Sequence, residues 1–130
     1  MKNIIVVEDD PFSQEFYKYL LKREGYLPLI IEEGDLLFNE LKNGAISLII
    51  MDINLKNTYL NDEKVDGVIL SRLVKENPEY FGIPILLVTA YSLVTDGPGF
   101  FKESLAEDYI TKPIMDYNLL LNKIKKLVEV

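Results

Sequence analysis

The feature that most constrains the fold of this chain is a regular alternation of short apolar runs with helical patterns. The apolar runs lie at residues 4–7, 27–31, 48–51, 83–88 and 109–110. The first, third and fourth are continuous and rich in Val, Ile and Leu, which is typical of strands covered on both faces in a parallel sheet. The sequence therefore predicts a parallel sheet built from these five runs.

Helical patterns fill the segments between the runs. The first has Phe12, Phe16, Tyr19 and Leu20 on one face and ends at Gly25. Strand–helix alternation of this kind predicts right-handed crossovers and a three-layer α/β sandwich, and the length supports one domain over residues 1–130. Further helices are predicted over residues 35–43, 68–74 and 114–130. Residues 93–101 contain Asp-Gly-Pro-Gly, so we expect any fourth helix to start late or be short.

Composition excludes several classes of function. The net charge of −7 argues against direct binding to nucleic acid or to an anionic membrane. The absence of Cys and His excludes disulfides, thiolate chemistry, imidazole metal ligands and every Ser–His or Cys–His catalytic arrangement. No signal peptide pattern is present, and no apolar stretch approaches the roughly 20 residues that span a bilayer. We therefore expect a cytoplasmic protein without membrane insertion.

Polar residues with complementary chemistry follow four of the predicted strands. Glu8 and Asp9 follow the first, Asp52 the third, Thr89 the fourth and Lys112 the fifth. Ligands of such folds bind outside the carboxyl ends of the strands, and acids that converge there repel one another unless they bind a cation such as Mg²⁺. A lysine and a hydroxyl at the same edge suit an incoming phosphoryl group. We predict that Asp52 accepts this group beside a divalent metal ion.

Each of these residues also has an ordinary structural interpretation. Asp10 precedes Pro11, and this pair is a plain helix start with Asp10 as the N-cap. Taken singly, the other residues could equally be solvated strand ends, loop caps or surface residues: Glu8, Asp9, Asp52, Thr89 and Lys112. Their combination at four strand ends is more specific than any one member.

The motifs, in their order, resemble the receiver domains of two-component response regulators. The resemblance covers nearly the whole chain and rests on IIVVEDD (4–10), MDINL (51–55), DG (66–67), VTA (88–90) and YITKP (109–113). It implies a flavodoxin-like (βα)5 fold with a five-stranded parallel sheet in the order 2-1-3-4-5. It also implies a signalling receiver that is phosphorylated by a sensor histidine kinase or histidine phosphotransfer protein and then switches binding of an unknown downstream protein. Such a receiver is not a conventional enzyme, because it catalyses only its own phosphorylation and slow dephosphorylation.

The resemblance also implies roles on the metal side of the site. Asp52 is the expected phosphoacceptor and Asp9 a direct ligand of Mg²⁺ or Mn²⁺, with Glu8 acting mainly through water. Asn54 would offer its backbone carbonyl to the metal. Asn54 and Tyr91 are also expected to influence how easily water reaches the phosphorylated aspartate, and the bulk of Tyr91 predicts slow loss of phosphate.

On the phosphoryl side, the resemblance implies that Lys112 and Thr89 hold the phosphoryl oxygens. Tyr109 would be an aromatic switch that turns inward when Thr89 moves. The bond between Lys112 and Pro113 is usually a cis peptide in this family, which a proline allows.

Two departures from the family pattern concern the output. Residues 56–65 lengthen the loop after Asp52 and lack the usual proline, and they are either an inert insertion or a contribution to partner selectivity. The Asp-Gly-Pro-Gly sequence at residues 96–99 alters a helix that commonly mediates output in this family.

Three other classes of function compete with the signalling receiver. An aspartate-nucleophile phosphatase would need a second aspartate where Asn54 stands. A non-phosphorylated pseudo-receiver scaffold usually loses the acid pair or the lysine, and this chain keeps both. A flavin-binding module is the weakest alternative, because no phosphate-cradling loop follows the first strand.

Overall fold

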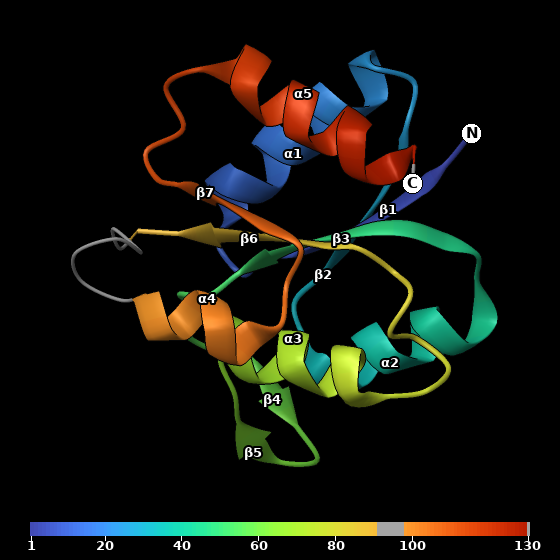
Figure 1. Ribbon diagram of the computed structural model, residues 1–130, viewed down its shortest axis with the longest axis vertical. Coiled ribbons are helices and arrows are strands. Elements are labelled where there is room, and N and C mark those ends of the chain that lie inside the picture. The colour runs from blue at the N-terminus through green and yellow to red at the C-terminus, as the bar shows by residue number, and fades with distance from the viewer. Residues whose placement is uncertain (91–97, 130) are drawn as a thin grey trace.

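A five-stranded parallel sheet forms the centre of the computed structural model, which describes residues 1–90 and 98–129 (Figure 1). Its strands in chain order are β1 (Asn3–Val7), β2 (Leu27–Ile31), β3 (Ile46–Asp52), β6 (Ile85–Thr89) and β7 (Asp108–Thr111). They lie side by side in the order β2-β1-β3-β6-β7. This is the order 2-1-3-4-5 when the five strands are counted along the chain, so the predicted fold class is confirmed.

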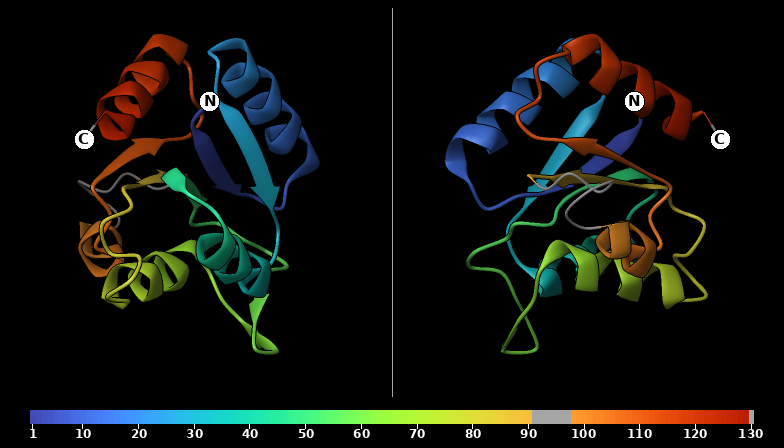
Figure 2. Two further views of the ribbon diagram at one scale, coloured as in Figure 1. Left: turned by 90° about the vertical axis from the view of Figure 1, so that its right-hand side faces the viewer. Right: turned by 60° about the vertical axis from the view of Figure 1, so that its left-hand side comes forward.

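Helices cover both faces of the sheet (Figure 2). One face carries α1 (Pro11–Arg23) and α5 (Tyr117–Val128), and the other carries α2 (Gly34–Asn43), α3 (Gly67–Glu76) and α4 (Pro98–Ser104). Successive side chains of a strand point to opposite faces, so Ile4 packs in the α1–α5 core and Ile5 in the core under α2 and α3. Both side chains have no exposed surface, which explains the continuous apolar run of β1.

Two helix predictions are refined by the structure. The fourth helix, α4, is only seven residues long, as its glycine and proline content predicted. The last helix begins at Tyr117 and not at Ile114, because Asp116 caps it by accepting a hydrogen bond from the Leu119 amide. Ile114 still packs against the α1–α5 core, so the apolar period of the sequence begins three residues before the helix itself.

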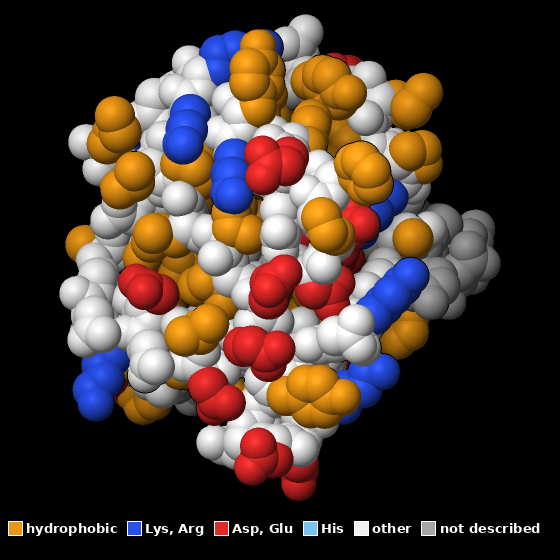
Figure 3. All heavy atoms as spheres, turned by 180° about the vertical axis from the view of Figure 1, so that it is seen from behind, with side chains coloured by type: hydrophobic (Ala, Val, Ile, Leu, Met, Phe, Trp, Pro, Cys, Tyr) orange, Lys and Arg blue, Asp and Glu red, His pale blue; other side chains and the backbone are white. Residues whose placement is uncertain are grey.

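The lengthened loop after Asp52 forms a hairpin that the sequence did not predict. Strand β4 (Tyr59–Leu60) pairs antiparallel with β5 (Glu63–Lys64) across Asn61 and Asp62. Both turn residues have positive φ, 50° and 67°, as a type I′ turn requires. Acidic side chains gather in a band on the rear face of the molecule, and the band reaches the lower end where the hairpin lies (Figure 3).

The hairpin is attached to the β2–α2 connection. The buried Thr58 hydroxyl donates a hydrogen bond to the Glu32 carbonyl at 2.7 Å, and the Tyr59 amide donates one to the Glu33 carboxylate at 3.0 Å. A Cβ atom on Gly34 would lie 3.0 Å from both the Leu60 Cβ and the Tyr59 carbonyl oxygen. The insertion is therefore packed closely on α2.

Candidate phosphoacceptor site

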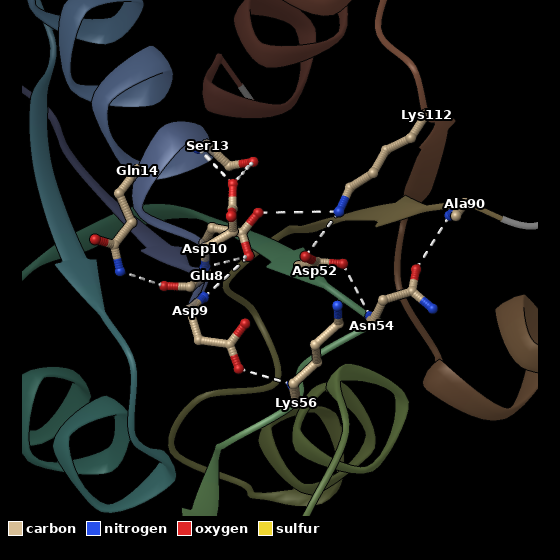
Figure 4. Close-up of polar contacts among 10 residues, drawn as sticks. All are labelled: Glu8, Asp9, Asp10, Ser13, Gln14, Asp52, Asn54, Lys56, Ala90 and Lys112. Atoms are coloured by element: carbon tan, nitrogen blue, oxygen red, sulfur yellow. Dashed lines mark hydrogen bonds and ion pairs between the residues drawn. The ribbon is translucent and has the colours of Figure 1, made fainter.

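Asp52 ends β3 at the carboxyl edge of the sheet, with 4% of its surface exposed. One carboxylate oxygen, Oδ1, accepts a hydrogen bond from the Asn54 amide at 2.9 Å. The other, Oδ2, accepts one from the Lys112 ammonium at 2.8 Å (Figure 4). Charge-assisted hydrogen bonds of this kind are short and fix the direction of the carboxylate. Asp52 is thus held as an oriented carboxylate at the floor of the cleft.

Gly67 allows α3 to begin directly beneath Asp52. A Cβ atom on Gly67 would overlap the Asp52 carbonyl oxygen and would lie 2.7 Å from the Ile53 Cα. Asp66, the preceding residue, caps α3 by accepting a hydrogen bond from the Ile69 amide at 2.9 Å. The Asp-Gly pair therefore combines a helix cap with the close approach that places the acceptor strand.

Glu8 lies beside Asp52 and is almost completely buried, at 1% exposure. Its Oε2 accepts hydrogen bonds from the amides of Asp9 and Asp10, at 2.9 and 3.3 Å. Its buried Oε1 has no hydrogen-bond partner among the described residues and lies 3.9 Å from the Lys112 Nζ. Burial, followed by the close approach of the Asp52 carboxylate, raises the pKa of Glu8 to about 7.

Asp9 faces the first turn of the inserted loop. Its Oδ2 accepts hydrogen bonds from the Lys56 amide at 2.7 Å and the Asn57 amide at 2.9 Å. Asp10 caps α1, as its position before Pro11 predicted, by accepting a hydrogen bond from the Ser13 amide at 2.9 Å. Hydrogen bonds from Ser13 lower the pKa of Asp10.

The donor chemistry of the cleft fits a hard divalent cation. Glu8, Asp9 and Asp52 line one hollow of about 350 Å³ together with Asn54, and carboxylate oxygens with water are what Mg²⁺ prefers. The unpartnered Glu8 Oε1 is a buried polar atom that such a cation would compensate. Within residues 1–90 and 98–129, no three acids are grouped as metal ligands as they stand. The two loop amides occupy the Asp9 Oδ2, which leaves its Oδ1 as the oxygen for a metal.

Lys112 reaches Asp52 from the end of β7. Its backbone amide donates a hydrogen bond to the Thr89 carbonyl at 2.7 Å, which places the lysine against the end of β6. The bond from Lys112 to Pro113 is cis, as the family resemblance implied. Thr89 is the last residue of β6 and is fully buried.

Among the predicted access and switch residues, Asn54 follows β3 and Tyr109 lies within β7. The Asn54 side chain accepts a hydrogen bond from the Ala90 amide at 3.2 Å, so Asn54 links the loops after β3 and β6. The Tyr109 ring packs against the Phe101 ring of α4, with the ring centres 5.2 Å apart. Tyr91 lies outside the described residues.

The sequence did not single out Lys56 as part of this site. Its side chain lines the same hollow as Asp52 and points from the inserted loop toward Asp52 and Asn54 (Figure 4). The available signal was a lysine four residues after Asp52, in the stretch where the family usually has a proline.

A parallel sheet in this order, with an acid pair after β1, an aspartate at the end of β3 and a lysine after β7, is the arrangement that the resemblance to receiver domains implied. The sequence model of the response regulator receiver domain matches residues 4–125, and the chain belongs to that family. In the part of the chain that the structure describes, no helix is both long and apolar enough to cross a membrane.

Individual relatives agree with this assignment. The TorCAD operon transcriptional regulatory protein TorR of Escherichia coli K12 is 32% identical over 126 residues, which cover 97% of this chain and 50% of TorR. The polar-differentiation response regulator DivK of Brucella anthropi is 26% identical over 113 residues, 87% of this chain and 85% of DivK. The solved structure of response regulator TrrA of Thermotoga maritima in complex with Mg²⁺ and BeF superimposes with a TM-score of 0.78 at 28% identity, over 98% of this chain and 99% of TrrA. This chain spans about half the length of the TorR proteins it matches.

Proposed function

We propose that residues 1–130 form a single receiver domain in which Asp52 accepts a phosphoryl group from a phosphohistidine of a histidine kinase or phosphotransfer protein. The observation that carries this proposal is the position and hydrogen bonding of the Asp52 carboxylate. It lies at the floor of an acidic cleft, with one oxygen held by the Asn54 amide and the other by the Lys112 ammonium. A positioned nucleophile and a fixed positive charge are the main requirements of phosphoryl transfer.

The transfer forms one bond and breaks one. An Asp52 oxygen attacks phosphorus as the phosphorus–nitrogen bond of the donor breaks. The electron pair of that bond stays on the imidazole nitrogen, which takes a proton from solvent. The Lys112 ammonium, 2.8 Å from the carboxylate, opposes the negative charge of the phosphoryl oxygens and keeps its own proton.

A divalent ion would be held by Asp9, Asp52 and the Asn54 carbonyl, with Glu8 acting through water, and would neutralise phosphoryl charge. The carboxylates alone would repel an incoming phosphoryl group, so this proposal predicts that phosphorylation depends on Mg²⁺ or Mn²⁺. The TrrA complex with Mg²⁺ and BeF, a relative 28% identical, supports this part of the proposal.

The donor protein would approach beside the acceptor cleft, over the surface between α1 and α5. A hollow of about 670 Å³ opens there beside Lys112, and its rim carries Phe12 with 88% of its surface exposed. Tyr117 from α5 lines the same hollow and is also exposed. Exposed aromatic side chains of this kind are common anchors in protein interfaces.

Switching would pass from Thr89 to Tyr109. Thr89 is buried at the end of β6, and Tyr109 packs on Phe101 of α4. Inward movement of the Tyr109 ring would change the α4–β7 surface and with it the binding of a downstream protein.

The direct test is intact-mass measurement after incubation with MgCl₂ and acetyl phosphate. Wild type should gain the mass of one phosphoryl group, Asp52→Asn should gain none, and Asp62→Asn in the hairpin turn should behave as wild type. If wild type gains no mass and also fails to bind beryllofluoride, the pseudo-receiver scaffold replaces this proposal. Steady turnover of p-nitrophenyl phosphate would instead favour the phosphatase.

A further inference from the structure

Lys56 is held at the wall of the acceptor cleft by its own backbone. Its amide and that of Asn57 both donate to the Asp9 carboxylate, at 2.7 and 2.9 Å. Hydrogen bonds to a carboxylate are among the stronger ones in proteins, so the backbone from which the Lys56 side chain extends is fixed in position. The hairpin that follows is anchored in turn on the β2–α2 connection through the buried Thr58.

From this origin the Lys56 side chain extends into the mouth of the cleft. Its ammonium group points toward Asp52 and Asn54, while Lys112 reaches Asp52 from the opposite side (Figure 4). Both lysines line the same hollow of about 350 Å³. A phosphoryl group on Asp52 would therefore lie between two cations contributed by separate loops.

The cleft is rich in carboxylates, with which a second cation would interact. Four carboxylates line the hollow, from Glu8, Asp9, Asp10 and Asp52, and Lys112 is already committed to Asp52. Among residues 1–90 and 98–129, the Lys56 ammonium has no ion pair or hydrogen bond of its own.

We propose that Lys56 is a second phosphoryl-binding residue, which donates hydrogen bonds to phosphoryl oxygens on the side away from Lys112 and weakens divalent-cation binding. This inference rests on the proposed function, because it deepens the account of the same cleft. The two effects have opposite signs, since one positive charge attracts the phosphoryl oxygens and repels the metal ion. No bond beyond those of the transfer itself changes, and Lys56 keeps its proton throughout.

The test compares Lys56→Met with Lys56→Arg and with Lys64→Met, which removes an exposed lysine at the end of the same hairpin. Mn²⁺ affinity is measured by electron paramagnetic resonance of the free ion, which requires no phosphorylation. Lys56→Met should bind Mn²⁺ about three-fold more tightly at low salt, with the difference shrinking as salt is added. Its phosphorylation rate with acetyl phosphate at saturating Mg²⁺ should fall about five-fold. Lys56→Arg should stay near wild type in both assays.

The outcomes separate this inference from the function on which it rests. If wild type is phosphorylated and Lys56→Met matches it in both assays, the role of Lys56 is refuted while the receiver function stands. Equal changes in Lys64→Met would also refute it, because the effect would then be general to the loop. If wild type is not phosphorylated at all, the proposed function fails, and the Mn²⁺ measurement still decides whether the Lys56 charge acts on the cleft.

Discussion

Glu8→Gln should make the metal-free protein more stable at neutral and alkaline pH. Glu8 is a 1% exposed carboxylate next to Asp52, and its Oε1 has no hydrogen-bond partner in the described part of the chain. A glutamine keeps an oxygen for the Asp9 and Asp10 amides and replaces the unpartnered oxygen with an amide that can donate to Asp52. The substitution therefore removes a buried charge without emptying the space.

The magnitude follows from the pKa of Glu8, which burial and Asp52 raise from its usual 4.5 to about 7. Below 4.5 both the folded and the unfolded states are protonated, and Glu8 carries no penalty. Between 4.5 and about 7 only the unfolded state releases the proton, so wild-type stability falls as pH rises through this window. Each pH unit is worth about 1.4 kcal/mol, and the full loss above the folded pKa is about 3 kcal/mol.

Urea unfolding in EDTA across this pH range measures the effect. The gap in the free energy of unfolding between Glu8→Gln and wild type should widen by about 3 kcal/mol from pH about 4.5 to about 8. Glu79→Gln, which changes an exposed glutamate outside the cleft, should show no such widening. A gap for Glu8→Gln that stays constant with pH would refute the reasoning, since it would mean that Glu8 releases its proton equally in both states.

Two further predictions concern the elements that carry the site. Gly67→Ala should lower the free energy of unfolding, measured in urea, by about 2–4 kcal/mol, because its Cβ would overlap the backbone of the acceptor strand. Gly82→Ala is the control and should be near neutral, because the space around Gly82 is open; similar losses for both variants would contradict this prediction. Thr58→Val should lower the free energy of unfolding by about 1–2 kcal/mol and speed amide hydrogen exchange in the hairpin, because the buried hydroxyl that donates to the Glu32 carbonyl is lost. Thr111→Val, at an exposed threonine, is the control, and unchanged exchange in Thr58→Val would contradict the anchoring of the hairpin.

The parts of the site that the sequence predicted are those fixed by strand topology. A continuous apolar run that ends in an acid places Asp52 at the carboxyl edge of the sheet, and parallel pairing of β1 with β3 then brings Glu8 and Asp9 beside it. Parallel pairing of β6 with β7 likewise brings Lys112 to this edge, although only the structure shows its 2.8 Å contact with Asp52.

The parts that could not be predicted depend on contacts between distant loops. Two-residue strands are too short to show a period, so the hairpin left no pattern in the sequence beyond the Asn61–Asp62 turn. The contact of Asp9 with the Lys56 amide joins residues 47 positions apart, and nothing local to either residue indicates it. The position of the Lys56 side chain in the cleft follows from that contact.

The central claim is that Asp52, and no other acid of the cleft, receives the phosphoryl group. The most direct measurement is to phosphorylate the protein with acetyl phosphate and Mg²⁺, reduce the acyl phosphate with borohydride, and map the resulting homoserine by peptide mass spectrometry. We predict homoserine at position 52 alone and none in Asp52→Asn. Homoserine at position 9 or 10 in wild type, or none at position 52, would contradict the account.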